Sequence, residues 1–583
     1  MNEVVKHLLV TKDTTIKETM KVIDEAPHKG APAGIALIVD KTNKLLGIVT
    51  DGDIRRATLR DVNLDSPVRD IMVKDPVTVT KGLTSGEMLD AVLKKVRESP
   101  RLRDFKVDKV IVVDEKGRVD DIVSFFEIWR KSEIKTREVC IVGLGYVGLT
   151  LAASLSDVGF RIIGVDHNKE VVEKLQQGKS HVHEVGLEPL LEYHLNKTFF
   201  VKPDLERSES DVYIICVETP VDKNNNPVMG PLERATTSVG EVLKKDDLVV
   251  VRSTVPVGVC RNSVLPILEK ESKLVRGKDF FLAFAPERTI EGKAIEELKK
   301  LPQIIGGLDK ISVELASKLF RELAPVIVNV DSLESAEMIK LINNSYRDLT
   351  FAYANELALI CDRLGLDTVK IIEAANEGYL RGGIPAPSPG VGGTCLKKDP
   401  HIFIYSIKKT GYEPLLVKHA RKINELMPSF IVEKVVRFCK SVKKDPSKIK
   451  VFIIGFAFKG RPETSDMRES STIDLLEHFR KLKLTNIHGY DPVVPKEEIE
   501  KLGIDACDLE QGFEKADCVL IMNNHESYSK IDIYPLLSKM NRPGLFFDGW
   551  HIFSNEIVAR VDGITYDGLG VYANNKNKTK HLR

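Results

Sequence analysis

The chain has 583 residues, and its 86 Lys and Arg residues nearly balance its 85 Asp and Glu residues, which leaves a formal net charge of +1. This length predicts three or four domains, and the balanced charge argues against a general attraction to nucleic acid or to an anionic membrane. The eight cysteines form no C-x-x-C pair and no apolar run has the length of a membrane span, so we expect a cytoplasmic protein with neither disulfides nor a metal site.

The first part of the chain contains an internal repeat. The segments IALIVDKTNKLLGIVTDGDIRR and KVIVVDEKGRVDDIVSFFEIWR align so that Asp40 pairs with Asp114 and Thr50 with Ser124. A helical pattern precedes each copy, so each predicts a small helix-strand-strand-helix unit. We expect both copies to lie within residues 1–133.

This repeat resembles a tandem pair of CBS domains, and GIVTDGDIRR carries the resemblance. The resemblance implies that Thr50 and Asp53 bind the ribose and phosphates of an adenine nucleotide such as AMP, ADP or ATP. In the second copy Asp121 stands in place of Gly47, and Glu127 in place of Asp53. One nucleotide site is therefore expected rather than two, and a scaffold that binds no nucleotide is the alternative.

After a charged linker the pattern changes to alternating strands and helices. EVCIVGLGYVGLTLAASLSDVGFRIIGVD predicts a strand, a glycine turn, a helix and a second strand. Further buried strands are expected at DVYIICV, DLVVVRS and DFFLAFAP. This order predicts a parallel sheet with crossover helices over residues 134–330.

The rest of the chain predicts a long helix followed by a second sheet. Residues 331–365 form one apolar-rich helical pattern within an expected central helical domain, residues 331–430. Strands at KVFIIGFAF, NIHGYD, DCVLIM and GLFFDG predict another doubly wound domain over residues 431–583. The expected fold class is α/β, with two Rossmann-like doubly wound domains joined by a long central helix and a CBS pair before them.

A glycine motif follows the first predicted strand of residues 134–330. Its residues Gly143, Leu144, Gly145, Tyr146, Val147 and Gly148 match G-x-G-x-x-G, and Asp166 ends the next strand. In this context the glycines favour a pyrophosphate at the helix N-terminus, and the carboxylate favours ribose hydroxyls. NAD is preferred over NADP, because the carboxylate argues against a 2′-phosphate. A glycine turn that binds nothing is the alternative.

Polar residues follow three other buried strands. Thr219 lies in ETP, Thr254 in STVPVG, and Glu287 and Glu291 in APERTIEG. Ligands of open α/β sheets lie at the carboxyl ends of the strands, so we expect these side chains within reach of the cofactor or the substrate. Helix caps for the threonines and solvated carboxylates for the glutamates are the alternatives.

Two further segments carry candidate catalytic groups. Lys340 and Asn344 share one face of the long helix and could stabilise an oxyanion, or Lys340 is an ordinary surface lysine. In PGVGGTCLKKDP, glycines precede Cys395 and two lysines follow it, and a helix N-terminus there would also favour the thiolate. Asp399 could hold a lysine or steer a water. A small buried thiol is the alternative for Cys395.

From residue 137 to about residue 573 the chain resembles the nucleotide-sugar 6-dehydrogenase family, which includes UDP-glucose 6-dehydrogenase and the UDP-N-acetylhexosamine dehydrogenases. The motifs occur in the family's order: GLGYVGL, HEVGL, ETP, STVPVG, PERTIEG, K-x-x-x-N, GVGGTCLKKD, GFAFKGRPETSDMRESS and YDP. The resemblance implies an NAD-dependent, four-electron oxidation of the C6 alcohol of a UDP-sugar to a carboxylate. It also implies a homodimer, or a higher homo-oligomer, that pairs through the long helix.

The resemblance further implies roles for individual residues. Cys395 would trap the aldehyde as a thiohemiacetal that becomes a thioester, and Glu287 or Asp399 would be the base for its hydrolysis. It also implies that Thr254 holds a water, that Lys340 and Asn344 hold the oxyanion, and that Lys398 holds Asp399 or the cofactor. Arg468 would contact the NAD pyrophosphate, and Lys459 the nucleotide-sugar phosphates. Arg381 would reach a neighbouring subunit's substrate, and the backbone at Gly393 and the Glu291 side chain would approach the sugar.

The sugar itself is left open between branches of the family. UDP-glucose enzymes carry an arginine in a DGR segment, where this chain has Asp548-Gly549-Trp550-His551. The PSPGVGGTC segment resembles the N-acetylhexosamine branch, whereas the retained Lys398 resembles the other. UDP-N-acetylmannosamine or UDP-N-acetylglucosamine is favoured, and UDP-glucose is the alternative. Two further readings are a nucleotide-sensing CBS protein with an inactive dehydrogenase body, and an enzyme that stops at the aldehyde.

Overall fold

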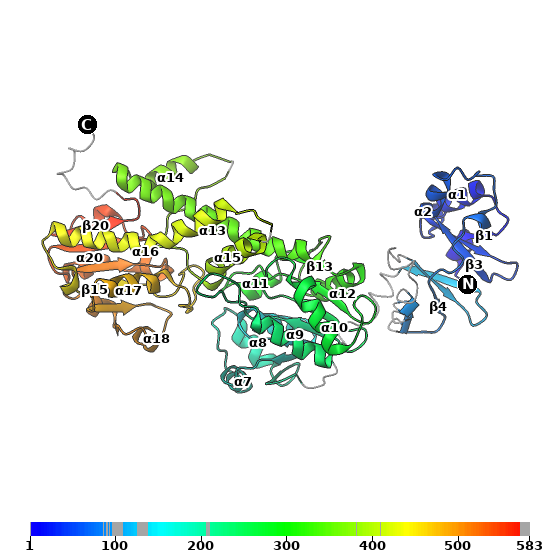
Figure 1. Ribbon diagram of the computed structural model, residues 1–583, viewed down its shortest axis with the longest axis horizontal. Helices are drawn as coiled ribbons and strands as arrows, with labels where there is room; N and C mark the ends of the chain where they lie inside the picture. The colour runs from blue at the N-terminus through cyan, green and yellow to red at the C-terminus, as the bar shows by residue number, and fades with distance from the viewer. Residues whose placement is uncertain are drawn as a thin grey trace. The chain divides into compact units, whose positions relative to one another are not determined.

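The structure is a computed structural model that describes residues 2–84, 87–88, 91–92, 94–95, 109–124, 138–205, 210–380, 382–408 and 410–571. The chain forms two compact units that meet in sequence between Arg137 and Glu138 (Figure 1). Among the described helices, none is long and apolar enough to cross a membrane.

The N-terminal unit confirms the internal repeat. It holds two three-stranded sheets of the same order, in which the first pair of strands is parallel and the second antiparallel. Both antiparallel pairs carry a register shift at the matching place, between Ile38 and Val39 and between Val112 and Val113. Leu37 and Ile111 share one core cluster, so the copies pack together. The elements are η1 (Glu3–Leu8), β1 (Leu9–Thr11), α1 (Ile16–Glu25), η2 (Pro27–Lys29), β2 (Ile35–Val39), β3 (Leu45–Thr50), α2 (Asp51–Thr58), η3 (Val68–Asp70), β4 (Thr78–Thr80), β5 (Lys109–Val113) and β6 (Val119–Ser124).

The second unit begins with an eight-stranded sheet in the order β14-β13-β12-β11-β10-β7-β8-β9. Neighbouring strands are parallel except β12 and β13. The order reverses between β7 and β10, which makes their carboxyl ends the expected binding edge. The strands are β7 (Glu138–Val142), β8 (Arg161–Val165), β9 (Phe199–Lys202), β10 (Val212–Ile215), β11 (Leu248–Val251), β12 (Phe281–Phe284), β13 (Gln303–Gly307) and β14 (Ile327–Asn329).

Helices connect these strands, and central strands such as β10 and β11 are buried along their whole length. Runs of Val, Ile and Leu suit such strands because crossover helices cover both faces of a parallel sheet. The connecting helices are α6 (Tyr146–Asp157), α7 (Lys169–Gln176), α8 (Leu187–His194), α9 (Gly230–Val242), η5 (Cys260–Val264), α10 (Leu265–Ser272), α11 (Ala294–Leu298) and α12 (Lys310–Arg321).

The predicted long helix is confirmed as α13 (Leu333–Leu364), which has 32 residues and a length of about 48 Å. It begins at the N-cap Ser332 and ends at Gly365, which adopts the left-handed conformation of a helix C-cap. α13 packs on β12 and β13, and also on α15 (Thr394–Lys408) and α16 (Leu415–Ser441); α14 (Thr368–Asn376) follows it in the chain. Figure 1 shows α13 and α16 side by side. α16 continues through residue 430, so the predicted domain boundary there falls inside a helix.

The last sheet has six parallel strands in the order β17-β16-β15-β18-β19-β20. This repeats the order of β7 to β12, and it confirms the second doubly wound sheet. Its elements are η6 (Pro446–Lys448), β15 (Val451–Ile454), α17 (Ser471–Lys481), β16 (Ile487–Tyr490), α18 (Lys496–Glu500), β17 (Asp505–Ala506), α19 (Leu509–Phe513), β18 (Cys518–Ile521), η7 (Glu526–Lys530), α20 (Ile533–Ser538), β19 (Gly544–Asp548), α21 (Asn555–Val558) and β20 (Ile564–Gly568).

Candidate active site

The glycine motif forms the turn between β7 and α6, as its spacing predicts. A Cβ atom on Gly148 would lie 1.8 Å from the carbonyl oxygen of Gly143, and Gly143 has a φ of +95°. A Cβ on Gly145 would meet no protein atom within 4 Å. Gly143 and Gly148 therefore let the turn and the helix pack closely. Gly145 borders open space at the N-terminus of α6, whose first residues are Tyr146 and Val147. This arrangement fits a pyrophosphate.

Asp166 lies at the end of β8 and is tied to the glycine turn. One carboxylate oxygen accepts the backbone N–H of Leu144 at 2.8 Å, and the other accepts that of Asn168 at 2.9 Å. Each oxygen keeps a further acceptor position. The carboxylate is thereby fixed beside the glycine turn, where a dinucleotide places a ribose.

At the binding edge, Thr219 has a buried hydroxyl without a partner. The residue is 2% exposed, and its Oγ1 forms no hydrogen bond within the described part of the chain. A buried hydroxyl in this position costs free energy unless a ligand or water bonds to it. Its neighbour on the edge, Thr254, is partly buried. The unpartnered Thr219 hydroxyl therefore fits a bound NAD.

Glu287 is held in a buried ion pair, so the solvated-carboxylate alternative is wrong for this residue. One carboxylate oxygen accepts both Nη2 and Nε of Arg252, the latter at 3.0 Å. The other accepts the backbone N–H groups of Arg288 and Thr289, each at 2.7 Å. Burial alone would raise the pKa of Glu287, but the Arg252 charge and the Thr289 N–H outweigh it and lower the pKa. Glu287 is therefore a fixed carboxylate.

The inner face of α13 carries the predicted polar pair. Lys340 and Asn344 are each 7% exposed, so the surface-lysine alternative is wrong. The Lys340 Nζ donates to the carbonyl oxygen of Glu287 at 2.5 Å. The side-chain amide of Asn344 donates to Asp399 Oδ2 at 2.6 Å, and Lys398 Nζ donates to Asp399 Oδ1 at 2.8 Å. Asp399 is fully buried between these two donors.

Cys395 is exposed at the second position of α15, whereas the other seven cysteines are buried. The buried-thiol alternative is therefore wrong. Burial would lower the pKa of the nearby Lys398, but Asp399 and Cys395 raise it. Lys397, the other lysine that follows Cys395, has acidic partners of its own. Its ammonium group pairs with Glu469 at 2.8 Å and Asp474 at 3.0 Å, which neutralise its charge.

The glycines before Cys395 allow its loop to pack closely on the C-terminal part of the unit. A Cβ on Gly392 would lie 2.7 Å from the carbonyl oxygen of Glu469, and one on Gly393 would lie 2.7 Å from the Phe458 ring. Gly393 also has a φ of +88°, which disfavours any other residue. The loop that carries the thiol is thus seated on the second doubly wound part.

A second group of charges gathers at the 290–292 turn. Lys459 Nζ donates to the carbonyl oxygen of Glu291 at 2.6 Å, and burial lowers the pKa of Lys459 to about 8. Burial and the Asp466 charge raise the pKa of Glu291 to about 7. Arg468 pairs with Asp466 at 2.7 Å, which raises the pKa of Arg468.

Several groups in the site were not found from the sequence. Glu184 of HEVGL accepts the backbone N–H groups of Gly292 and Ala294 at 2.7 and 2.8 Å, together with the Tyr146 hydroxyl. Burial and the Glu184 carboxylate raise the pKa of Tyr146. Arg252 was also missed, although its position directly after an all-apolar strand is a signal for a buried partner. Arg381 lies outside the described residues, and so does Glu127 of the second CBS-like copy.

In the N-terminal unit, Thr50 and Asp53 form a capping box at the start of α2. Thr50 accepts the backbone N–H of Asp53 at 3.3 Å, and Asp53 accepts the Thr50 backbone N–H at 3.0 Å and its hydroxyl at 2.7 Å. Arg56 pairs with Asp53 at 2.7 Å. These residues therefore already stabilise the helix, and nucleotide binding by them stays a prediction.

Trp550 stands where the resemblance to UDP-glucose enzymes leads us to expect an arginine. Its Nε1 donates to the carbonyl oxygen of Met522 at 3.0 Å. Asp548 accepts the backbone N–H of Trp550 at 3.1 Å and that of Phe553 at 2.8 Å, and burial raises the Asp548 pKa to about 6. The segment is thus fixed by its own hydrogen bonds.

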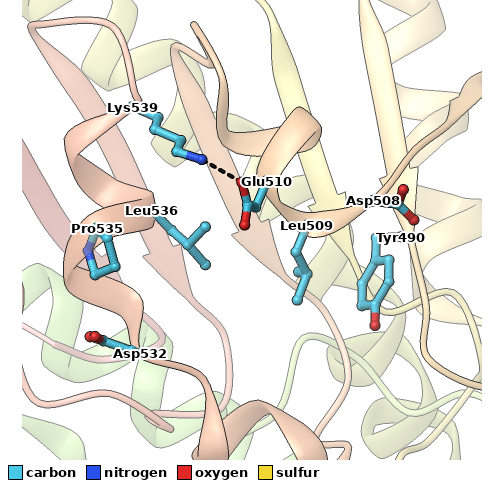
Figure 2. A pocket seen from close by; sticks show the side chains of 8 residues that line it. All are labelled: Tyr490, Asp508, Leu509, Glu510, Asp532, Pro535, Leu536 and Lys539. Carbon is cyan, nitrogen blue, oxygen red and sulfur yellow. Dashed lines mark hydrogen bonds and ion pairs between the residues drawn. The ribbon is translucent and has the colours of Figure 1, made fainter.

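A separate hollow lies at the end of β16, between α19 and α20 (Figure 2). Lys539 and Glu510 pair across it at 2.7 Å. No residue of the arrangement around Cys395 lines this hollow, so it does not belong to the candidate active site. Its lining residues are Tyr490, Asp508, Leu509, Glu510, Asp532, Pro535, Leu536 and Lys539.

Comparison with protein families matches four segments of the chain. Three match the UDP-glucose/GDP-mannose dehydrogenase family: its NAD binding domain at residues 137–324, its central domain at 334–426 and its UDP binding domain at 452–555. The CBS domain family matches residues 3–60.

Individual relatives agree with these matches. The chain is 32% identical to a UDP-N-acetyl-D-mannosamine dehydrogenase of Pyrococcus horikoshii, over 74% of this chain and 99% of the relative. It is 33% identical to one of Campylobacter jejuni, over 68% and 97%. The solved UDP-D-ManNAc dehydrogenase of Pyrococcus horikoshii has a TM-score of 0.68 and 31% identity, covering 74% of this chain and 99% of that one. A UDP-glucose dehydrogenase of Pyrobaculum islandicum has a TM-score of 0.65 and 25% identity, covering 75% and 98%.

Proposed function

Because the chain belongs to the UDP-glucose/GDP-mannose dehydrogenase family, and is an NAD-dependent UDP-sugar dehydrogenase, we propose that its substrate is UDP-N-acetyl-D-mannosamine. The reaction is the oxidation of the sugar C6 alcohol to the carboxylate in one site. The observation that carries this proposal is the exposed Cys395 thiol beside the Lys398, Asp399 and Asn344 array. The names of the relatives favour the N-acetylmannosamine substrate over UDP-glucose.

The glycine turn and Asp166 would hold NAD, which would supply the hydride acceptor for two successive oxidations at C6. The first oxidation yields the C6 aldehyde, and the Cys395 sulfur adds to its carbonyl carbon to form a thiohemiacetal. Removal of the second hydride leaves a thioester on Cys395. Water then displaces the thiolate and yields the carboxylate. In balance, C6 loses four electrons as two hydrides to two NAD molecules, the water supplies the second carboxylate oxygen, and three protons are released.

The geometry supports distinct tasks for the groups around the thiol. Lys340 and Asn344 are buried donors on one face of α13, which suits stabilisation of the oxyanion. Of the two carboxylates considered as base, Asp399 is supported, because it contacts Lys398, whose charge interacts with Cys395. Glu287, whose carboxylate pairs with Arg252, is the alternative base. The remaining roles expected for Thr254, Lys459, Arg468 and Arg381 stay proposals.

The enzyme is also proposed to be a homodimer that pairs along α13. Apolar side chains at spacings of four and seven residues form an exposed stripe on this helix, which is the pattern of a helix-pairing surface. A reducing cytoplasm suits its free thiols. Light scattering of wild type and Tyr353→Glu tests the pairing, with the variant expected to be monomeric. The stripe consists of Ile342, Tyr346, Tyr353, Ile360 and Leu364.

The CBS unit is proposed to bind an adenine nucleotide and to regulate turnover. Calorimetry of the full chain with AMP, ADP and ATP tests this, with Asp53→Ala as the binding-deficient variant. Regulation also requires that the bound nucleotide change kcat or KM. The absence of binding for all three nucleotides would leave the unit as a scaffold.

The function itself is tested with purified protein, NAD and a panel of UDP-N-acetylmannosamine, UDP-N-acetylglucosamine and UDP-glucose. Two NADH are expected per sugar, with the highest kcat/KM for UDP-N-acetylmannosamine, and Cys395→Ala should abolish turnover. One NADH per sugar would support an enzyme that stops at the aldehyde. Failure to reduce NAD with any of the sugars would support the inactive-body reading.

A further inference from the structure

Arg421 on α16 is the largest fully buried side chain in the described part of the chain. Its Nη1 donates to Asp348 Oδ1 at 2.8 Å and to the carbonyl oxygen of Leu396 at 3.0 Å. Its Nη2 donates to the carbonyl oxygen of Val391 at 3.4 Å. The two carbonyl groups lie on either side of Cys395 in the sequence. One guanidinium therefore holds the backbone before and after the thiol.

Pro400 explains why the carbonyl oxygen of Leu396 needs an outside donor. Within an α-helix this carbonyl would accept the backbone N–H of residue 400, four positions later. Pro400 lies inside α15 and has no N–H to donate. Arg421 supplies a donor to the carbonyl that the proline leaves without its helical partner. Pro400, the last residue of PGVGGTCLKKDP, thus makes the backbone next to Cys395 depend on a hydrogen bond from Arg421.

The same arginine links the thiol segment to α13. Asp348 follows Asn344 by one helical turn, and its carboxylate is fully buried against Arg421. Asn424 donates to both the backbone carbonyl and the carboxylate of Asp348, at 2.9 and 2.8 Å. Such a buried pair is expensive to desolvate and adds little net stability. Its effect is to fix the Cys395 segment against the helix that carries Lys340 and Asn344.

The network continues to the start of the loop. Asn355 on α13 donates to the side-chain oxygen of Asn424 at 2.9 Å, and its own side-chain oxygen accepts the backbone N–H of Ser388 at 2.8 Å. The loop is therefore held to α13 at Ser388, and through Arg421 at Val391 and Leu396.

We propose that Arg421 is a positioning residue for Cys395. Arg421 replaces the hydrogen bond that Pro400 removes, and it thereby holds the thiol in place relative to Lys340, Asn344 and Asp399. The inference rests on the proposed function, because it takes Cys395 as the nucleophile. Arg421 has no part in binding the sugar or NAD under this proposal. Its loss should therefore lower kcat and leave KM nearly unchanged.

The test compares Arg421→Met with Lys434→Met. Lys434 is a matched control, since it is another buried cation of α16 and pairs with Asp362 of α13 at 2.7 Å and with Asp567 at 2.7 Å, away from the Cys395 loop. Arg421→Met should lower kcat about 100-fold, as expected for a misplaced reacting group. It should also change the rate at which iodoacetamide alkylates Cys395. Lys434→Met should lower thermal stability but change neither kcat nor that rate.

Two further variants keep the proposal testable if Arg421→Met does not fold. Arg421→Lys keeps the charge beside Asp348 but cannot reach both carbonyl groups, so kcat should still fall. Pro400→Ala restores a backbone N–H for Leu396, and in the double variant with Arg421→Lys it should recover turnover roughly tenfold relative to Arg421→Lys alone.

The outcomes separate this inference from the function on which it rests. If Cys395→Ala abolishes turnover while a folded Arg421→Lys or Arg421→Met keeps wild-type kcat and alkylation rate, the positioning role is overturned and the function stands. If Cys395→Ala still releases two NADH per sugar, the nucleophile assignment itself is wrong. A loss of kcat with unchanged KM, relieved by Pro400→Ala, supports the proposal.

Discussion

The side-chain amide of Asn344 donates a 2.6 Å hydrogen bond to the carboxylate of Asp399, and this bond joins α13 to the first turns of α15. Lys398 holds the other carboxylate oxygen at 2.8 Å. Because Cys395 stands four residues before Asp399, the thiol, the lysine and the carboxylate share a fixed arrangement that α13 anchors.

Asp399→Asn keeps the shape of the side chain but removes its charge. If Asp399 is the base for thioester hydrolysis, kcat should fall about 100- to 10,000-fold. Stopped-flow absorbance should still show a rapid burst of NADH, and mass spectrometry should detect an acyl group on Cys395. Asp474→Asn is the control, because Asp474 pairs with the adjacent Lys397, which Glu469 continues to hold. Hydrolysis at the wild-type rate in Asp399→Asn would exclude Asp399 as the base.

Glu287→Gln leaves Arg252 without its charge partner in a buried position. At neutral pH this should cost about 3–5 kcal/mol of stability, the usual loss when one partner of a buried pair is removed. The pKa of Glu287 is lowered in the folded protein from its ordinary 4.5. The ionised Glu287 carboxylate therefore stabilises the folded protein fully at pH values above its ordinary pKa. This stabilisation is lost as the pH falls through the lower pKa of the folded protein. The stability difference between wild type and variant should shrink accordingly in acid.

Urea unfolding at several pH values measures this difference. Glu334→Gln is the control, because Glu334 pairs with Arg261 in a partly exposed position and should cost less than about 1 kcal/mol. A stable Glu287→Gln protein that has lost only thioester hydrolysis would instead identify Glu287 as the base.

Local sequence patterns were sufficient to predict the features that depend only on residues close together in the chain. The glycine turn at Gly143, the polar face of α13 and the exposed thiol segment all follow from spacings within one element or turn. The pairing of Glu287 with Arg252 spans 35 residues, and that of Leu396 with Arg421 spans 25. The first pair forms because β11 and β12 are neighbouring strands, and the second because α15 packs on α16. No local spacing in the sequence records either arrangement. The acidic partners of Lys397 were not predicted for the same reason, since Glu469 and Asp474 lie on a distant segment.

Lys459 gives a prediction for the pH dependence of substrate binding. Burial lowers its pKa to about 8, so its positive charge is complete only below that pH. If Lys459 binds the diphosphate of the substrate, KM for the UDP-sugar should rise about tenfold per pH unit above pH 8, while KM for NAD stays level. Lys459→Arg should remove this rise, because arginine remains charged. An unchanged rise in Lys459→Arg would assign it to another group.

The glycine turn provides a contrast between two neighbouring substitutions. In Gly148→Ala the new Cβ would lie 1.8 Å from the Gly143 carbonyl oxygen, so overpacking should lower stability by about 1–3 kcal/mol or more. In Gly145→Ala the new Cβ meets no protein atom within 4 Å, and the φ of −63° suits alanine. Gly145→Ala should therefore keep the wild-type melting temperature but bind NAD more weakly, because its methyl group takes up space that the pyrophosphate needs.

Calorimetric titration with NAD and thermal unfolding without it separate the two effects. UDP-sugar binding serves as the control and should be unchanged in Gly145→Ala, because the glycine turn is expected to contact the NAD pyrophosphate and not the UDP-sugar. If Gly145→Ala binds NAD as tightly as the wild type, then the pyrophosphate does not approach this glycine. The cofactor would then contact other residues of the binding edge.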